Sequence, residues 1–323
     1  MRRFLTVFAA VMFALPVAPA LAQAFPAKTV NIVVPYPPGG VVDMLSRALA
    51  IELTKLWSQP VVVQNVPGAS SIIGANKVAN AEPDGHTLLL TIDPTVISNR
   101  FLYKKLSYDP DKSLVPITMI ARSGQLVIAN PAFPANSVRE LVEAARLAPG
   151  RIAYASSGKG TQANLLFETI GKHEGVEFLQ VPYKGSVPMT TAVMAGEVQV
   201  SLVSPGTAGS MVRAGRVKAL AIGGVQRSSL FPDVQTIAES GYPYAASVIW
   251  WGLFAPGGAS PQLVERINRD VTSIAKRPDF TTKYITASGL ELVADTPAEF
   301  SAAIRADLKV TAEMVKAAGV QPE

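Results

Sequence analysis

The 323-residue sequence contains no cysteine and only two histidines, His86 and His173. Without cysteine, disulfides, thiol nucleophiles and zinc sites with cysteine ligands are excluded. A Ser-His-Asp triad would have to use one of the two histidines, and no Gly-x-Ser-x-Gly elbow is present. Charged residues make up only 16% of the chain and hydrophobic residues 49%, which suffices for a sizeable core. The composition therefore argues against a disordered chain and against most metal and nucleophile chemistry.

The first segment has the pattern of a secretory signal peptide. Arg2 and Arg3 precede an apolar run that ends with the small-x-small sequence Ala20-Leu21-Ala22. This run is too short for a comfortable membrane span, and two prolines follow it. We therefore expect residues 1–22 to be a signal peptide that is cleaved near Ala22, and the mature chain to be secreted.

Basic residues are scattered along the sequence. The formal net charge is +5, of which Arg2 and Arg3 belong to the expected signal peptide. No stripe of basic residues with interleaved aromatic residues is present, which argues against a nucleic-acid partner. Neither histidine has the spacing of a metal ligand, so we expect no metal. We also expect no cofactor and a monomeric protein.

Strand-like and helix-like segments alternate along the chain, which predicts an α/β fold. The expected strands cover residues 30–35, 61–63, 87–92, 126–129, 152–155, 178–181, 198–203, 217–222 and 250–255. The expected helices cover residues 41–56, 72–79, 137–147, 162–172, 188–195, 207–214, 262–275, 278–285 and 297–318. The pattern restarts near Pro116, which indicates two lobes.

Two segments share the order strand, glycine-rich loop and helix, at residues 30–40 and 152–160. A helix N-terminus presents unpaired N–H groups and partial positive charge, so each loop could bind an anion. In the first loop the N–H donors start at Gly39 and Gly40, because two prolines precede them. The carboxylate of Asp43 is placed to hold a loop N–H. A plain strand-to-helix turn is the alternative.

The second loop adds hydroxyl and amide groups to the backbone donors. It contains Ser157, Gly158, Lys159, Gly160, Thr161 and Gln162. It is not a Walker motif, because a glycine follows the lysine. A solvated surface loop is the alternative. Two such loops facing each other across a cleft would suit a carboxylate ligand.

Six stretches, in this order, resemble the Bug or TctC-like periplasmic solute-binding proteins of tripartite tricarboxylate transporters, and the resemblance covers essentially the whole mature chain. They are VPYPPGGVVD at 34–43, NVPGAS at 65–70, PDGHTLL at 83–89, LYKKLSYD at 102–109, VPYKG at 181–185 and GLFAP at 252–256. The resemblance implies a type II periplasmic-binding fold, with two α/β lobes of mixed, mostly parallel sheets and a ligand cleft between them. It implies a first lobe of residues 24–125 plus 247–323 and a second lobe of residues 126–246.

The resemblance also implies which residues hold the ligand. The loops from Tyr36 to Gly40 and from Ser156 to Thr161 would bind its carboxylate. The expected binding residues are Tyr36, Pro38, Gly39, Gly40, Ser70, Ser71, Asp93, Ser157, Gly158, Lys159, Gly160, Thr161, Gln162, Tyr183 and Ser204. No catalytic residue is expected.

Two positions depart from the pattern of many relatives. This chain has Leu202-Val203-Ser204 where relatives read Phe-Asp-Asn, and Val203 cannot meet a ligand ammonium group. This favours a plain carboxylate or an acid with an apolar tail over an amino acid. After Thr91 the chain has Asp93-Pro94, where relatives often have Thr-His. Asp93 would repel a second carboxylate if it faced the cleft, and a turn-forming role before Pro94 is the alternative.

The sequence thus predicts a periplasmic receptor that captures a small organic carboxylate and delivers it to integral-membrane transporter subunits. A ligand sensor that docks on a membrane signalling kinase is an alternative. A periplasmic α/β hydrolase is a further alternative, for which the two histidines provide no convincing base.

Overall fold

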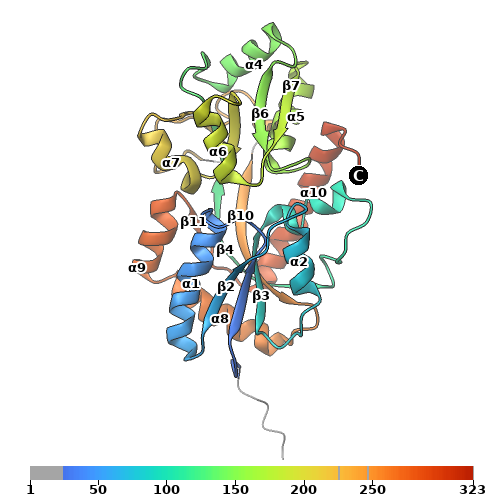
Figure 1. The fold of residues 1–323 in the computed structure, drawn as a ribbon, viewed down its shortest axis with the longest axis vertical. Coiled ribbons are helices and arrows are strands. Elements are labelled where there is room, and N and C mark those ends of the chain that lie inside the picture. Colours follow the sequence, from blue (N-terminus) through green and yellow to red (C-terminus); the bar gives the residue numbers. More distant parts are fainter. Residues whose placement is uncertain (1–24, 225, 246, 323) are drawn as a thin grey trace, which may run out of the picture.

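The structure of the protein is a computed structural model that describes residues 25–224, 226–245 and 247–322. The predicted signal peptide, residues 1–22, lies outside the described residues. Figure 1 shows two lobes stacked along the long axis of the molecule, each with its own sheet and flanking helices. The expectation of two α/β lobes is confirmed.

The first lobe contains a sheet with the strand order β11-β4-β10-β3-β1-β2. Its strands are β1 (Val30–Val34), β2 (Val61–Asn65), β3 (Thr87–Ile92), β4 (Leu114–Gly124), β10 (Val248–Pro256) and β11 (Glu291–Leu292). Its helices are α1 (Val41–Trp57), α2 (Ile72–Ala79), α3 (Asn99–Leu102), α8 (Pro261–Ala275), α9 (Pro278–Phe280) and α10 (Pro297–Ala318).

Helices cover both faces of this sheet. Ile32 and Val34 of β1 pack in a core with residues of α1 and α8, whereas Val33 packs with residues of α2 and α10. Successive side chains of a strand point to opposite faces, so a strand buried on both faces needs an uninterrupted apolar run. This requirement explains the apolar sequence of β1. The first glycine-rich loop begins where this strand ends.

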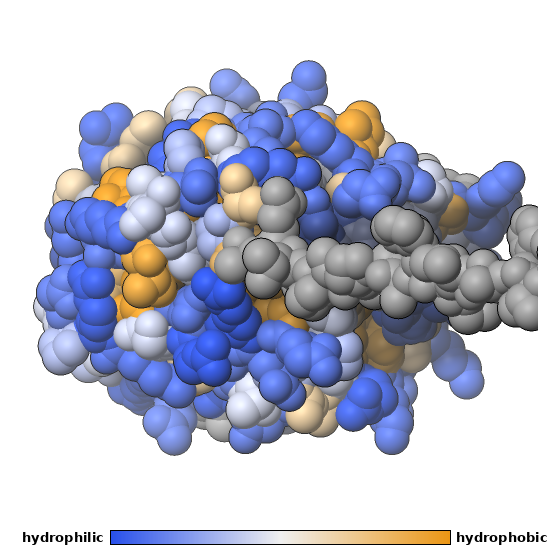
Figure 2. Space-filling view, turned by 90° about the horizontal axis from the view of Figure 1, so that it is seen from below, coloured by the Kyte–Doolittle hydropathy of each residue, from blue (hydrophilic) through white to orange (hydrophobic). Residues whose placement is uncertain are grey.

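The end of the first lobe that lies at the bottom of Figure 1 is shown in Figure 2. Its visible surface is mainly hydrophilic, and apolar residues occur only in small separate areas. Among the described residues, no helix is both long and apolar enough to cross a bilayer.

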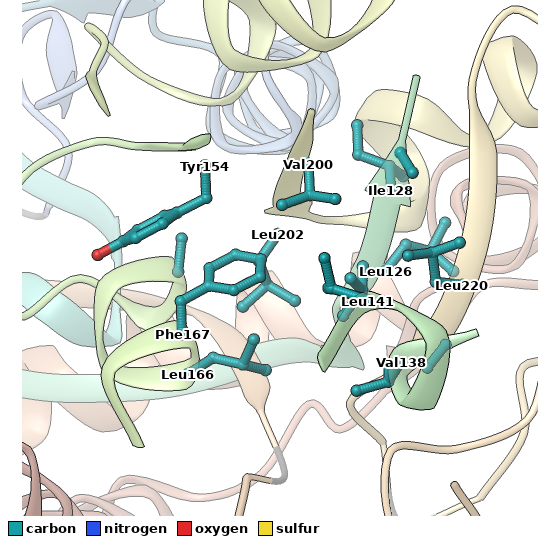
Figure 3. Packing of buried hydrophobic residues seen from close by; sticks show 14 of the residues in the cluster. Leu126, Ile128, Val138, Leu141, Tyr154, Leu166, Phe167, Val200, Leu202 and Leu220 are labelled. Carbon is teal, nitrogen blue, oxygen red and sulfur yellow. The ribbon is translucent and has the colours of Figure 1, made fainter. Parts of the chain in front are cut away.

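The second lobe contains a sheet with the strand order β7-β6-β8-β5-β9. Its strands are β5 (Leu126–Ala129), β6 (Ile152–Ser156), β7 (Phe178–Pro182), β8 (Val200–Val203) and β9 (Lys218–Ile222). Its helices are α4 (Val138–Leu147), α5 (Gln162–Glu174), α6 (Ser186–Ala195) and α7 (Pro205–Arg213). Figure 3 shows its core, in which the Tyr154 and Phe167 rings pack with centroids 4.5 Å apart.

The chain passes between the sheets at two places. Gln125 connects β4 to β5, and Ser247 immediately precedes β10. The predicted lobe boundaries at 125/126 and 246/247 fall at these crossings and stay a prediction. A third contact between lobes comes from α10, which packs on α5 and brings Val315 against Leu165.

The sheets are mixed, as expected, but antiparallel pairing is more extensive than the expectation of mostly parallel strands. Strand β1 pairs in parallel with β2 and β3, and β6 pairs in parallel with β7 and β8. Strand β10 is antiparallel to β3 and β4, and β5 is antiparallel to β8 and β9. The strands next to the crossings, β4, β5 and β10, therefore account for most of the antiparallel pairing.

Candidate functional site

A cleft with two adjoining halves lies between the lobes. The first half has a volume of about 340 Å³ and is lined by residues of α1, β10, α5, α6 and β8. The second half has a volume of about 330 Å³ and is lined by the loop before α2 and the loop before α6. The residues common to both halves are Tyr36, Pro37, Ile92, Pro94, Ser157, Thr161, Lys184 and Gly185.

Most of the predicted binding residues line this cleft. Those in the first half are Tyr36, Pro38, Gly40, Ser157, Thr161, Gln162 and Ser204. The second half adds Ser70, Ser71 and Tyr183. Five predicted residues are not part of the lining of either half, namely Gly39, Gly158, Lys159, Gly160 and Asp93. Ligand contact by any of these residues stays a prediction.

The first glycine-rich loop is fixed by Asp43, as the sequence predicts. Gly39 N donates to Asp43 Oδ2 at 3.1 Å, and Arg47 and Asn65 also donate to this carboxylate. Burial alone would raise the pKa of Asp43, but the hydrogen bonds from Arg47 and Asn65 outweigh it and lower the pKa. The N–H of Gly39, expected to face a ligand, is therefore used inside the loop.

The donors of this loop that remain for a ligand begin at Gly40. Met44 N donates to Gly40 O as the first hydrogen bond of α1, so the N–H groups of Val41 and Val42 have no acceptor within the helix. In the described part of the chain, no hydrogen bond engages Gly40 N. These N–H groups lie at the positive end of a 17-residue helix.

The second glycine-rich loop is also held by its own hydrogen bonds. Gly158 N donates to Ser156 Oγ at 3.2 Å, and Gly160 N donates to Asn164 Oδ1 at 2.6 Å. The amide of Asn164 donates in turn to the Tyr154 hydroxyl in the core of the second lobe. The core thus positions the loop, and the groups that face the cleft are Ser157, Thr161 and Gln162, which lie at and beside the start of α5.

Four helices begin at the first half of the cleft. The residues that precede α1, α5, α6 and α7 are Gly40, Thr161, Gly185 and Ser204, and all four line it. None of these residues makes a side-chain capping hydrogen bond. The four N-termini contribute partial positive charge to the cleft, and its lining, as far as the chain is described, includes no arginine.

Sequence reasoning found the starts of α1 and α5 but missed those of α6 and α7. For α7 the sequence Ser204-Pro205 was an available signal, because serine followed by proline is typical of a helix start. The hydroxyls of Ser186 and Thr207, which lie at these helix starts, were also missed. Thr207 Oγ1 lies 3.0 Å from Ser204 Oγ and 3.4 Å from Ser186 Oγ. The three hydroxyl groups carry three protons, and the two contacts between them use only two. One O–H therefore remains to donate into the cleft.

The second half of the cleft is bordered by a strained loop. Ala69, Ser70 and Ser71 all have positive φ angles, of 45°, 50° and 75°. Such angles are unfavourable for residues other than glycine and need support from their surroundings. Tyr103 donates to Ser70 Oγ at 3.0 Å, and Ser71 Oγ lies 2.8 Å from Thr95 Oγ1. These contacts hold both serine residues at the cleft.

Asp93 lies behind the cleft, and its side chain is only 3% exposed. Gln162 Nε2 donates to Asp93 Oδ2 at 2.7 Å, and Ser247 Oγ donates to Gln162 Oε1 at 2.9 Å. Asp93 Oδ1 has no hydrogen-bond partner among the described residues. Burial, opposed only in part by Gln162, raises the pKa of Asp93 to about 7. Asp93 therefore connects the two lobes beside the crossing at Ser247.

Charged side chains are scarce around the cleft. Asp43 and Lys184 are the charged residues in the lining of the two halves, and Asp43 is paired with Arg47 at 2.9 Å. In the described part of the chain, no three histidine, aspartate or glutamate side chains gather as metal ligands would. The chemistry that the cleft offers is hydrogen-bond donation from N–H and O–H groups beside apolar walls.

Comparisons with known proteins agree with this geometry. The sequence profile of the tripartite tricarboxylate transporter family receptor matches residues 45–320. Protein BugT of Bordetella pertussis is 32% identical over 305 residues, which cover 94% of this chain and 93% of BugT.

Solved structures are similar over nearly the whole chain. An R. palustris protein with adipate has a TM-score of 0.88 and 30% identity, over 93% of this chain and 100% of that protein. MatC from Rhodopseudomonas palustris, with bound malate, has a TM-score of 0.85 and 28% identity, over 90% of this chain and 100% of MatC. The chain therefore belongs to the receptor family of the tripartite tricarboxylate transporters, which consists of periplasmic solute-binding proteins of the Bug and TctC type.

Proposed function

We propose that this receptor binds a small organic carboxylate in the cleft between its lobes. The observation that carries the proposal is the convergence of the N-termini of α1, α5, α6 and α7 on one half of the cleft. An N-terminus binds an anion through its N–H groups and its dipole. Because α1 belongs to the first lobe and the other three helices to the second, a carboxylate would gain all of these interactions only when the cleft is closed.

The receptor delivers its ligand to the membrane subunits of a tripartite transporter and does not transform it. The family description and the carboxylates bound by two similar proteins support this role. The ligand would then be recovered unchanged after prolonged incubation with the protein, which NMR of the mixture can follow. Ligand consumption would favour the hydrolase alternative.

A thermal-shift panel of carboxylates and their uncharged amides tests the binding proposal. A carboxylate at a hundred times its Kd should stabilise the protein by about 2.7 kcal/mol, whereas the matched amide should have little effect. If amides and carboxylates shift the melting temperature equally, or if no carboxylate shifts it, the proposal is wrong.

Gly40 offers a matched pair of variants. Its φ of −82° is compatible with proline, which would remove the N–H, and an added Cβ would lie 3.8 Å from Ser186 Oγ. Gly40→Ala adds the Cβ but keeps the N–H. We expect Gly40→Pro to bind the carboxylate about tenfold to a hundredfold more weakly than Gly40→Ala, since a charge-assisted hydrogen bond contributes about 1.5–3 kcal/mol. Equal affinities would show that this N–H does not contact the ligand.

A further inference from the structure

The walls of the first half of the cleft are mainly apolar, and both lobes contribute to them. The first lobe supplies Val41, Val42, Ile92, Pro94, Ile249 and Trp251. The second lobe supplies Ala163, Val187, Pro188, Met189 and Leu202. Most of these side chains also belong to the buried cores of the lobes, so the walls are rigid.

Most polar groups of this half lie at the starts of α1, α5, α6 and α7. At α5 the Thr161 hydroxyl and the Gln162 amide already donate within the protein. The groups at the other three starts lie next to one another. A Cβ on Gly40 would lie 3.8 Å from Ser186 Oγ, which brings the start of α1 next to that of α6. Thr207 connects α6 to α7 through its contacts with Ser186 and Ser204. Lys184, one residue before the N-cap of α6, is exposed and makes no ion pair with any described residue. A ligand carboxylate at this place would therefore have the Lys184 cation and several N–H and O–H donors around it.

A second carboxylate directed at the apolar walls would have no such partner. Asp43, the other charged residue of the lining, is an anion whose oxygens already accept from Arg47, Asn65 and Gly39. Leu202 adds a further apolar side chain to the lining, whereas Val203, which the sequence analysis considered as a ligand contact, is not part of it. An ionised group moved from water to such a wall loses its hydration without compensation.

From this separation of polar and apolar groups we infer that the ligand is a monocarboxylate with an apolar tail. The inference rests on the proposed function and deepens it. The carboxylate lies at the starts of α1, α6 and α7 near Lys184, and the tail packs on Met189, Leu202 and Trp251. The cleft thereby discriminates against an acid of the same length that carries a second carboxylate at its far end.

Hexanoate and adipate test this inference, because they share one carbon chain and differ in the second carboxylate. Isothermal titration of the mature protein should give a Kd for hexanoate at least tenfold below that for adipate. Adipate binding as tightly as hexanoate, or more tightly, would overturn the inference but leave the carboxylate receptor intact. Hexanamide, added as a third ligand, should bind weakly. If it bound as well as hexanoate, the proposed carboxylate site itself would be wrong.

Two methionines of α6 provide matched variants. Met189 is 4% exposed and lines the cleft, whereas Met194 is half-buried and lies outside the lining. Met189→Gln puts an amide of similar size on the apolar wall and should weaken hexanoate binding at least fivefold, while Met194→Gln should leave it unchanged. Equal effects of the two variants would refute the tail contact. If Met189→Gln does not fold, the hexanoate affinity of Met189→Ala tests the contact with the tail instead. The ratio of the hexanoate and adipate affinities of the unmodified protein then still tests the preference for a monocarboxylate.

Discussion

Replacing Asp93 by asparagine should change the pH dependence of stability in a defined direction. Asp93 is 3% exposed, and its pKa rises from 3.8 to about 7 because burial disfavours the charged carboxylate. Asp307 on α10 adds to this effect, and the hydrogen bond from Gln162 opposes it. Between pH 3.8 and about 7 the folded protein therefore holds a proton that the unfolded chain has released.

The sign follows from this proton balance. The stability that comes from the protonated carboxyl is fully present below pH 3.8 and is lost as the pH rises through about 7. A rise in pKa from 3.8 to about 7 corresponds to a loss of about 4 kcal/mol of unfolding free energy across this window. The asparagine side chain of the variant would not titrate, and its carbonyl oxygen could still accept from Gln162, so this loss should be absent in Asp93→Asn.

The measurement is urea unfolding of both proteins at about pH 4, 6 and 8, with the free energy of unfolding extrapolated to water. Other titrating groups are common to both proteins and largely cancel in the difference. We expect the stability of Asp93→Asn relative to the unmodified protein to rise by about 4 kcal/mol from roughly pH 4 to pH 8. A difference that does not vary with pH would show that Asp93 has an ordinary pKa and that burial does not hold its proton.

Three further substitutions follow from single contacts. A Cβ on Gly206 of α7 would lie 2.7 Å from Val41 of the opposite lobe, so Gly206→Ala should hinder closure and weaken ligand binding about tenfold in a calorimetric titration. Asp43→Asn loses the ion pair with Arg47 and should lower the free energy of unfolding, measured with urea, by about 1–3 kcal/mol. Phe300 is fully buried, and changing it to alanine should lower the free energy of unfolding, measured in the same way, by about 3–5 kcal/mol.

The controls for these substitutions differ. Gly206→Ala should leave the free energy of unfolding nearly unchanged, because its conflict lies between lobes, and equal losses of affinity and stability would contradict this account. Ser210→Ala, on the exposed side of the same helix, should alter neither quantity. A cost below about 1 kcal/mol for Phe300→Ala would contradict the tight packing of its ring against Trp250 and Phe254.

Local signals in the sequence predicted most elements. The apolar run at Val30–Val34 predicts a strand buried on both faces, and the helix expected at 137–147 is present as α4, with Ser137 accepting from Glu140 N as its N-cap. Strand β4 was missed, since Pro116 interrupts its pattern. In the structure Pro116 pairs with Phe254 at a register shift, where a missing N–H costs little.

The candidate site was harder to predict, because its donors depend on tertiary partners. The sequence places Gly39 and Gly160 in loops that could bind an anion. The sequence predicts that Asp43 holds a loop N–H, but only the fold shows that this N–H is that of Gly39 and that Asn164 accepts from Gly160 N. The starts of α6 and α7 meet that of α1 through contacts between the lobes, which no local pattern encodes.

The absence of arginine from the lining has a consequence for how the receptor works. An arginine closed into an empty cleft would be a buried and unpaired cation, so the empty protein would be held open by a large desolvation cost. Helix N-termini carry only partial charges, and water can hydrogen-bond to their N–H groups when no ligand is bound. We therefore expect a small free-energy difference between open and closed forms, which a modest carboxylate affinity is enough to shift. The same small difference would allow the cleft to reopen, as the proposed delivery of the ligand to a membrane transporter requires.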